Sequence, residues 1–304
     1  MTAEPVSRAA LARVGFADPG AATDHLLAPE LADVARQPWL LPALARAADP
    51  DLALLGLHRL LGASAGTEER APLLAALERD ESVRDGLVLV LGASRALADH
   101  LERHPEHWRR ADATGDRRPT ASGLRAQLME AVHGRAGTVA LDALRVSYRA
   151  ALLGIAARDL AADADIGDVA AELADLAAAT LEAALTVART EAGPGAADCR
   201  LAVVAMGKCG GRELNYVSDV DVVFVAEPAD GAAQSLAAAM MRACSVSTGE
   251  GSIWPVDAAL RPEGKAGPLV RTLASHLAYY EKWARTWEFQ ALLKARPVAG
   301  DLEL

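Results

Sequence analysis

Two aspartates, Asp219 and Asp221, stand at the start of the apolar run 220–225. In a β-strand, residues two apart project from the same face, so a strand here would place both carboxylates side by side. Carboxylate oxygens are the ligands that Mg²⁺ prefers, usually together with the phosphates of a substrate. The spacing therefore predicts a divalent-metal site formed by this pair.

Three glycines, Gly207, Gly210 and Gly211, precede the aspartates. Glycine allows a chain reversal and leaves backbone amides uncovered, so that a phosphate can approach closely. Ser218, directly before the pair, is a further candidate for phosphate contact. A glycine-rich turn followed by a strand with paired aspartates is typical of phosphoryl transfer, in which two metal ions bridge the attacking oxygen, the phosphorus and the leaving oxygen.

A third carboxylate is expected on a neighbouring strand. Asp257 is the best candidate, and Glu263 is the fallback. Arg261 and Lys265 follow closely and could contact phosphate oxygens, arginine being suited to a bidentate contact. The predicted catalytic and metal-binding set is therefore Asp219, Asp221 and Asp257.

Each of these features also has an ordinary structural interpretation. Paired aspartates at a strand start are often a turn or a capped end, and the glycines alone favour a hairpin or a helix terminus. Arg261, before Pro262, would by itself be taken for a surface arginine. The combination of these features favours the metal site over the separate interpretations.

The histidines and cysteines are not predicted to form a site. His100, His104 and His107 have helical spacing, but Pro105 interrupts the helix and no carboxylate-rich set accompanies them. Cys209 lies inside the glycine-rich turn with only Lys208 as a basic neighbour, so we interpret it as structural.

Composition excludes several classes of function. The net charge of −10 over 304 residues opposes the phosphate neutralisation on which nucleic-acid binding depends. The three cysteines show neither a disulfide framework nor CxxC spacing, which indicates a reducing compartment. The first residues lack a secretory signal, and no apolar run approaches membrane-spanning length. We therefore expect a cytoplasmic, non-membrane protein that does not bind nucleic acid.

The first part of the chain is expected to be an alanine-rich helical domain, residues 1–192, which ends in a glycine- and proline-containing stretch at 191–198. Asp168 is predicted to cap its last helix, after a turn marked by Asp163, Asp165 and Gly167. Earlier helices are drawn through Leu52–Leu61, Ala71–Glu78 and Ser94–Arg103, and a surface loop through Arg110–Gly123.

The catalytic domain is expected at residues 199–275. Its predicted strands are the apolar runs Leu201–Met206, Val220–Val225 and Ile253–Leu260, with a helix at Ser235–Cys244. Residues 276–304 are predicted to start a following helical region, with helix over His276–Leu293. The fold class is therefore α+β, a small α/β domain flanked by α-helices.

Long motifs resemble a known family. The strings MGKCGGRELNYVSDVDVVFV, from Met206, and VDAALRPEGKAGPLV, from Val256, resemble the nucleotidyltransferase module of bifunctional glutamine-synthetase adenylyltransferase/adenylyl-removing enzymes. Supporting stretches lie at 91–108, 156–185 and 279–301. The resemblance implies a polymerase-β-like domain with a mixed sheet and a two-metal Mg²⁺ site. The family has a second arginine where DAALRPEG has alanine, which puts a second phosphate contact in doubt.

Members of that family join two such halves in one chain. The helices before the motif and the string GGRELNYVSDVDVVF resemble the amino-terminal, adenylyl-removing half. Only one paired-aspartate motif of this kind, with a glycine-rich turn before it and an apolar run after it, is present, so we expect a fragment of a longer protein. The implied reaction is phosphorolysis of a tyrosyl-AMP ester of glutamine synthetase, which consumes phosphate and gives ADP. In the roles that the resemblance implies, Asp219, Asp221 and Asp257 bind metal, Gly210 and Gly211 cradle phosphate, and Arg261 neutralises charge.

Three alternatives remain open. The same site could use ATP to attach AMP to glutamine synthetase, and sequence separates the two directions only through resemblance. A non-catalytic module that senses a nucleotide or a nitrogen-signalling regulatory protein is disfavoured, because Asp219 and Asp221 are both intact. A template- or tRNA-directed nucleotidyltransferase is disfavoured by the acidic charge.

Overall fold

The computed structural model describes residues 7–114, 118–161, 164–193 and 199–304. The chain forms two compact units, one of Met1–Arg118 with Arg149–Ala164 and one of Pro119–Tyr148 with Asp165–Leu304. The division falls inside helix α9 (Gly137–Ala161). The domain boundaries that we expected at residues 192 and 275 stay predictions, because a division into compact units does not show which parts fold independently.

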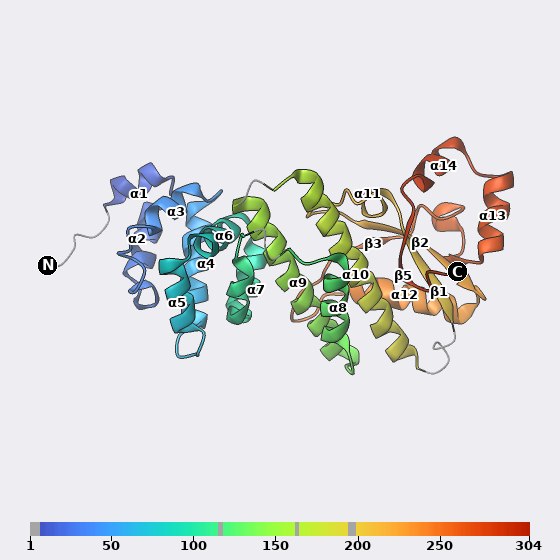
Figure 1. Ribbon diagram of the computed structural model, residues 1–304, viewed down its shortest axis with the longest axis horizontal. Coiled ribbons are helices and arrows are strands. Elements are labelled where there is room, and N and C mark those ends of the chain that lie inside the picture. Colours follow the sequence, from blue (N-terminus) through green and yellow to red (C-terminus); the bar gives the residue numbers. More distant parts are fainter. Residues whose placement is uncertain (1–6, 115–117, 162–163, 194–198) are drawn as a thin grey trace. The chain divides into compact units, whose positions relative to one another are not determined.

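The first unit is helical throughout its described part (Figure 1). Asp18, Asp49, Asp80 and Ser94 begin its helices, since each side chain accepts a hydrogen bond from an amide of the first turn. Buried leucines and alanines from successive helices form one apolar core. The predicted helices at 52–61, 71–78 and 94–103 are confirmed as parts of α4, α5 and α7. The elements before α9 in this unit are α1 (Arg8–Val14), α2 (Pro19–Leu27), η1 (Pro29–Leu31), α3 (Leu40–Arg46), α4 (Pro50–Ala63), α5 (Arg70–Arg79), α6 (Glu81–Ala93), α7 (Arg95–Arg103) and η2 (Pro105–Ala111).

Two helices, α8 (Ala121–Val132) and α10 (Ile166–Ala192), pack together in the second unit. The predicted cap of α10 was wrong: Asp165, not Asp168, is the cap. Asp165 has an extended backbone and its Oδ1 accepts from the Gly167 amide at 2.7 Å, whereas Asp168 already lies in the first helical turn. Asp163 lies outside the described residues. The expected loop Arg110–Gly123 is shorter than predicted, because η2 extends to Ala111 and α8 begins at Ala121; residues 115–117 are not described.

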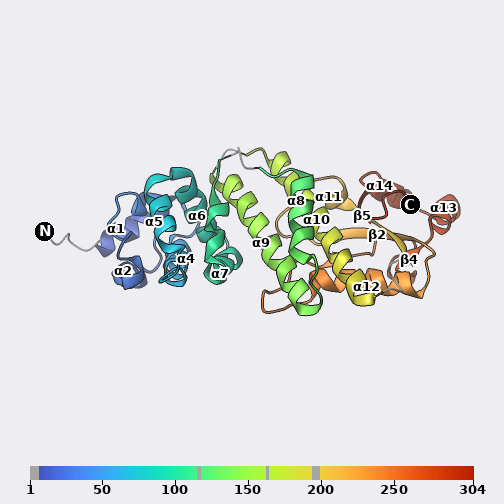
Figure 2. The same cartoon turned by 60° about the horizontal axis from the view of Figure 1, so that its bottom comes forward.

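A small mixed sheet forms the centre of the second unit, in the strand order β3-β2-β1-β5, with β4 also paired to β2 (Figures 1 and 2). Strand β1 (Arg200–Ala205) is antiparallel to β2 (Val220–Glu227) and to β5 (Arg296–Gly300). Strands β3 (Val256–Asp257) and β4 (Val270–Arg271) are parallel to β2. Helix α12 (Gly231–Ser245) follows β2 and packs against α10, which also contacts β5. The α+β fold class with a mixed sheet is confirmed.

The third predicted strand, Ile253–Leu260, is much shorter in the structure. Only Val256–Asp257 pairs with β2. Pro255 has no N–H to donate to a ladder, and Asp257 Oδ1 accepts from the Ala259 amide at 2.7 Å, which turns the chain out of the sheet. The first two predicted strands and the helix at 235–244 are confirmed as β1, β2 and α12.

The last part of the chain differs from the expected helical region. The predicted helix His276–Leu293 is two helices, α13 (Leu273–Lys282) and α14 (Thr286–Leu292), and Glu288 caps the second by accepting from the Arg285 amide at 2.7 Å. Residues 296–300, which were assigned to the start of a following helical region, form strand β5 on β1. Pro297 and Gly300 give this segment no strand signal, and its position at the sheet edge is where proline is tolerated. Pairing with β1, a tertiary contact, decides its structure.

None of the helices in the described residues is both long and apolar enough to cross a membrane.

Candidate active site

Three carboxylates meet at one end of strands β2 and β3. Asp219 immediately precedes β2, and Asp221 is its second residue. Because β2 and β3 are parallel with Asp221 opposite Asp257, these two side chains leave neighbouring strands at the same level. The structure therefore brings together the three residues that the sequence analysis chose as metal ligands.

The three carboxylates are close enough to interact electrostatically. The pKa of the Asp221 carboxyl is raised above its ordinary value, first by partial burial and then by the negative charges of Asp257 and Asp219. Lys208 acts in the opposite direction and lowers it. A partly buried group of like charges is costly without a cation, so this arrangement suits a divalent metal ion.

Gly207 brings the backbone against the carboxylates. Its φ of +52° is unfavourable for other residues, and a Cβ at this position would lie 2.6 Å from Asp221 Oδ2. The Met206 amide donates to the Asp221 carbonyl oxygen at 2.8 Å and fixes the turn to β2. Gly207 was predicted as part of the glycine-rich turn but not as a site residue. Its position directly after an apolar run was the available signal.

Gly210 and Gly211, predicted to cradle phosphate, lie in the short helix α11 (Gly207–Gly210) and just after it. Their amides donate to the carbonyls of Met206 and Gly207, at 2.9 and 3.1 Å. Gly210 is buried, and a Cβ there would lie 2.0 Å from the Lys294 carbonyl oxygen. In the described conformation these two glycines allow α11 to pack closely, and their N–H groups are engaged within the turn.

Two polar residues of the β1–β2 connection flank the carboxylates. Lys208 is exposed, interacts electrostatically with Asp221, and places its Nζ 3.4 Å from Asn215 Oδ1. Ser218 is partly buried, and its hydroxyl donates to the Asp219 carbonyl at 2.9 Å. Lys208 was missed as a site residue; as the only basic residue within the glycine-rich turn, it could have been chosen.

Arg261 holds the loop after β3 together. Its guanidinium donates to the carbonyls of Ala258 at 2.7 Å, Gly267 at 3.0 Å and Pro268 at 3.1 Å. Burial lowers the pKa of this group, and the nearby negative charge of Asp257 opposes that shift. Arg261 thus lies beside the carboxylates with its donors directed at backbone oxygens.

The fallback carboxylate and the predicted lysine lie further along the same loop. Glu263 is exposed, has a left-handed backbone with φ +64°, and forms an ion pair with Arg271. Lys265 is exposed in the short 3₁₀ turn η5 (Gly264–Ala266). Neither residue is among the charges that shift the pKa of Asp221.

Cys209 has the character of a structural residue, as predicted. It is buried, and burial raises the pKa of its thiol to about 11, so the thiolate is scarce at neutral pH.

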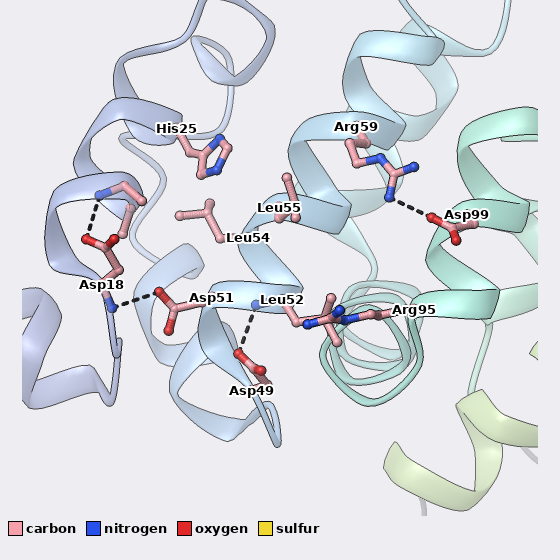
Figure 3. A pocket seen from close by; sticks show the side chains of 12 residues that line it. Asp18, His25, Asp49, Asp51, Leu52, Leu54, Leu55, Arg59, Arg95 and Asp99 are labelled. Carbon is pink, nitrogen blue, oxygen red and sulfur yellow. Dashed lines mark hydrogen bonds and ion pairs between the residues drawn. The ribbon is translucent and has the colours of Figure 1, made fainter.

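A separate pocket of about 450 Å³ lies in the first unit (Figure 3). Three of its carboxylates accept hydrogen bonds from backbone amides. Asp18 and Asp49 cap helices, and Asp51 accepts from the Ala17 and Asp18 amides. Arg59 and Asp99, which both line the pocket, form an ion pair (Figure 3). We assign this pocket no part in the chemistry of the carboxylate site.

The chain is similar to several known proteins. A family model described as glutamate-ammonia ligase adenylyltransferase matches residues 85–304. A bifunctional glutamine synthetase adenylyltransferase/adenylyl-removing enzyme of Streptomyces avermitilis is 58% identical over 302 residues, which are 97% of this chain and 30% of that protein. Proteins of the same description from Mycobacterium tuberculosis and Nocardia farcinica are 50% and 47% identical; the matches cover 87% and 100% of this chain, and 27% and 32% of those proteins. The chain spans about 30% of the length of these curated relatives.

Proposed function

The chain belongs to the glutamate-ammonia ligase adenylyltransferase family, and we propose that it removes AMP from an adenylylated tyrosine of glutamine synthetase by metal-dependent phosphorolysis, releasing ADP. The observation that carries the proposal is the meeting of Asp219, Asp221 and Asp257 at one end of β2 and β3. The relatives are described by two opposite activities. We assign this chain the adenylyl-removing one, because its motifs resemble that half.

Mg²⁺ fits the donor set of the site. The three side chains offer hard oxygen ligands. The pKa of Asp221 is raised first by burial and then by repulsion from Asp257 and Asp219, and a cation would relieve that repulsion. Asp219, Asp221 and Asp257 would hold the metal. When bound, Mg²⁺ neutralises charge on the phosphoryl oxygens and orients the attacking and leaving oxygens.

The reaction exchanges one phosphorus–oxygen bond for another. An oxygen of inorganic phosphate forms a bond to the phosphorus of AMP, while the bond from that phosphorus to the tyrosine oxygen breaks. The tyrosine oxygen leaves with the electron pair and takes a proton from solvent, and the attacking hydrogen phosphate gives up its own proton to solvent. The products are ADP and unmodified tyrosine.

The remaining polar residues have proposed supporting roles. Lys208, beside Asp221, would contact phosphate oxygens, and Ser218 and Lys265 are further phosphate contacts. Gly210 and Gly211 shape the turn that brings Lys208 to the carboxylates. Arg261 would set the position of Asp257 through the loop carbonyls that it binds, and its charge lies near enough to act on a bound phosphate.

The direction of the reaction rests on resemblance to the adenylyl-removing half. ATP-dependent attachment of AMP is the second candidate, favoured by the description of the family model as an adenylyltransferase. Both reactions need the same carboxylates, so the site geometry supports either. Glutamine synthetase as protein substrate, and a nitrogen-signalling protein as regulator, are part of the proposal.

A direct test mixes the protein with adenylylated glutamine synthetase, Mg²⁺ and phosphate, and measures ADP. We expect ADP to form, to require phosphate, and to be lost in Asp221→Asn. Glu281→Gln, which removes an exposed carboxylate of α13, is the matched control and should keep the activity. ATP-dependent modification of unmodified glutamine synthetase, without ADP formation from the modified enzyme, would transfer the assignment to attachment. Inactivity in both assays, together with nucleotide binding, would identify a sensing module.

A further inference from the structure

Three histidines of the first unit lie together, although Pro105 separates them in the sequence pattern. His100 and His104 are one helical turn apart at the end of α7, with ring centroids 5.0 Å apart. The chain then reverses through η2, and the His107 ring stacks on His100 at 5.1 Å. We call His100, His104 and His107 the histidine cluster.

His100 has one ring nitrogen with a partner and one without. Its Nε2 lies 2.9 Å from His107 Nδ1, while its Nδ1 is buried and has no hydrogen-bond partner among the described residues. The residue itself is fully buried. If Nε2–H donates to His107, the lone pair on Nδ1 is buried with no donor among the described residues, which is costly unless a ligand binds there.

His104 offers a second nitrogen nearby. A ring nitrogen of His104 lies within 4.8 Å of one of His100, so a small rotation of the side chains would bring both nitrogens to the ~2.0–2.1 Å at which they bind one Zn²⁺ ion. His104 Nδ1 lies 3.6 Å from Glu106 Oε1, so a carboxylate faces its other side. In each of the two histidines, one ring nitrogen therefore has a polar neighbour: His107 for Nε2 of His100, and Glu106 for Nδ1 of His104. The other ring nitrogen is the one that would bind a metal ion.

This pattern is the usual environment of metal-binding histidines. A ligating imidazole normally donates its second N–H to a carboxylate or another acceptor, which orients the ring and raises its basicity. His107 Nδ1 would take that role for His100, and Glu106 for His104.

We propose that His100 and His104 bind a divalent transition-metal ion of the zinc class, with His107 and Glu106 as positioning residues and water completing the coordination. Imidazole nitrogens favour Zn²⁺, Cu²⁺ and Ni²⁺ over Mg²⁺, whereas the three aspartates of the active site offer only oxygen. The two sites therefore select different metals. The inference does not depend on the proposed function.

The test titrates Zn²⁺ into chelator-treated full chain by calorimetry, with Mg²⁺ in large excess to occupy the carboxylate site. We expect one Zn²⁺ per chain, and none for His104→Ala. His133→Ala, which removes an exposed histidine outside the cluster, is the matched control and should bind as the wild type does. Absence of Zn²⁺ binding by the wild type, or equal loss in the His133 variant, would overturn the proposal.

A second pair of variants tests the positioning role without removing a ligand. In His107→Asn the amide Oδ1 can take the place of Nδ1 as acceptor, so Zn²⁺ affinity should stay near that of the wild type. His107→Leu removes the acceptor and should weaken binding by ~10–100-fold. Equal affinities in these two variants would contradict the role of His107.

A spectroscopic measurement on the wild type guards against variants that do not fold. Cu²⁺ added in place of Zn²⁺ should show coupling to imidazole nitrogen in its electron paramagnetic resonance spectrum. A spectrum with oxygen ligands only would overturn the assignment.

Discussion

Asp221 on β2 and Asp257 on β3 lie opposite each other in parallel register. Asp221 is the second residue of β2, and Asp257 is the last residue of β3. The two carboxylates therefore lie close together at the end of the sheet where β2 begins, and Asp219 adds a third negative charge. The arrangement is unfavourable for the protein alone and favourable with a bound cation. The first two predictions follow from this relationship.

Replacing one of the charges should stabilise the metal-free protein. Asp221→Asn keeps the size of the side chain and removes its repulsion with Asp219 and Asp257. Because the group is partly exposed, we expect a gain of no more than ~1 kcal/mol in the free energy of unfolding. Thermal unfolding in chelator should show a higher midpoint than for the wild type, and the rise on adding Mg²⁺ should disappear.

Glu281→Gln is the control for this change, since it removes one negative charge from an exposed position of α13. It should keep the wild-type response to Mg²⁺. A full Mg²⁺ response in Asp221→Asn would rule out this carboxylate as a metal ligand.

The pH dependence should have a defined sign. The pKa of Asp221 is higher in the folded than in the unfolded chain, so the folded protein binds more protons in the range above the ordinary aspartate value of ~3.9. In chelator, the free energy of unfolding of the wild type minus that of Asp221→Asn should therefore fall as pH rises through this range. Taking the difference cancels the titration of other groups.

Mg²⁺ should show the opposite trend, because it binds the ionised carboxylates. Its stabilising effect on the wild type should grow as pH rises through the same range, measured as the shift in unfolding midpoint at fixed Mg²⁺. A stabilising effect independent of pH between 4 and 7 would disagree with ligation by Asp221.

Gly207 should tolerate no side chain. In Gly207→Ala the methyl group would have to displace the Asp221 carboxylate, and the φ of +52° adds backbone strain. We expect a loss of ~1–3 kcal/mol in the free energy of unfolding and weaker Mg²⁺ binding. Denaturant unfolding and calorimetric titration of Mg²⁺ measure both effects.

Gly231→Ala is the matched control. Gly231 is the first residue of α12, and a Cβ there meets nothing within 4 Å. Stability should be unchanged or raised by up to ~1 kcal/mol. If Gly207→Ala behaved in the same way, the close approach to Asp221 would not hold in solution.

Arg261 should be needed for the loop that follows β3. Arg261→Lys keeps the charge but cannot reach the carbonyls of Ala258, Gly267 and Pro268 together, so we expect a loss of ~1–3 kcal/mol in the free energy of unfolding. Lys265→Ala, at an exposed position of the same loop, should leave stability unchanged. A stable Arg261→Lys protein with a raised KM for phosphate would favour a direct phosphate contact instead.

The cysteines should differ in reactivity. Burial raises the pKa of Cys209 to about 11 and of Cys244 to about 12, whereas Cys199 is only half-buried. At pH 8 we expect iodoacetamide to modify Cys199 first and the other two only after unfolding, as read by peptide mass spectrometry. Rapid labelling of Cys209 in the folded protein would show that the glycine-rich turn opens.

Sequence was informative where the chemistry is local. Asp219 and Asp221 adjoin an apolar run, so their shared face follows from the period of a strand. The predicted helices of the first unit follow from the periodicity of their apolar residues. The choice of Asp257 from a later apolar run was also correct in placing it near the pair. Its register with Asp221 was not readable, because register between parallel strands depends on the packing of α12 and the sheet.

Tertiary structure alone decided the remaining features. Residues 296–300 carry no strand pattern and become β5 only by pairing with β1. Arg261 has the residue type of a phosphate ligand, yet the fold presents three backbone carbonyls to it. Pro105 ends α7 as expected, but the reversal after it returns His107 to His100, which helical spacing could not indicate.

The division has a physical reason. The amino-acid sequence determines which groups can ionise, which backbone positions can turn and which faces are apolar, since these are properties of one residue and its near neighbours. The partner of each polar group depends on which segments the folded chain brings within hydrogen-bond distance. For this protein, the sequence by itself determined that Asp219 and Asp221 lie together at the start of a strand, and the tertiary structure decided that Asp257 lies beside them.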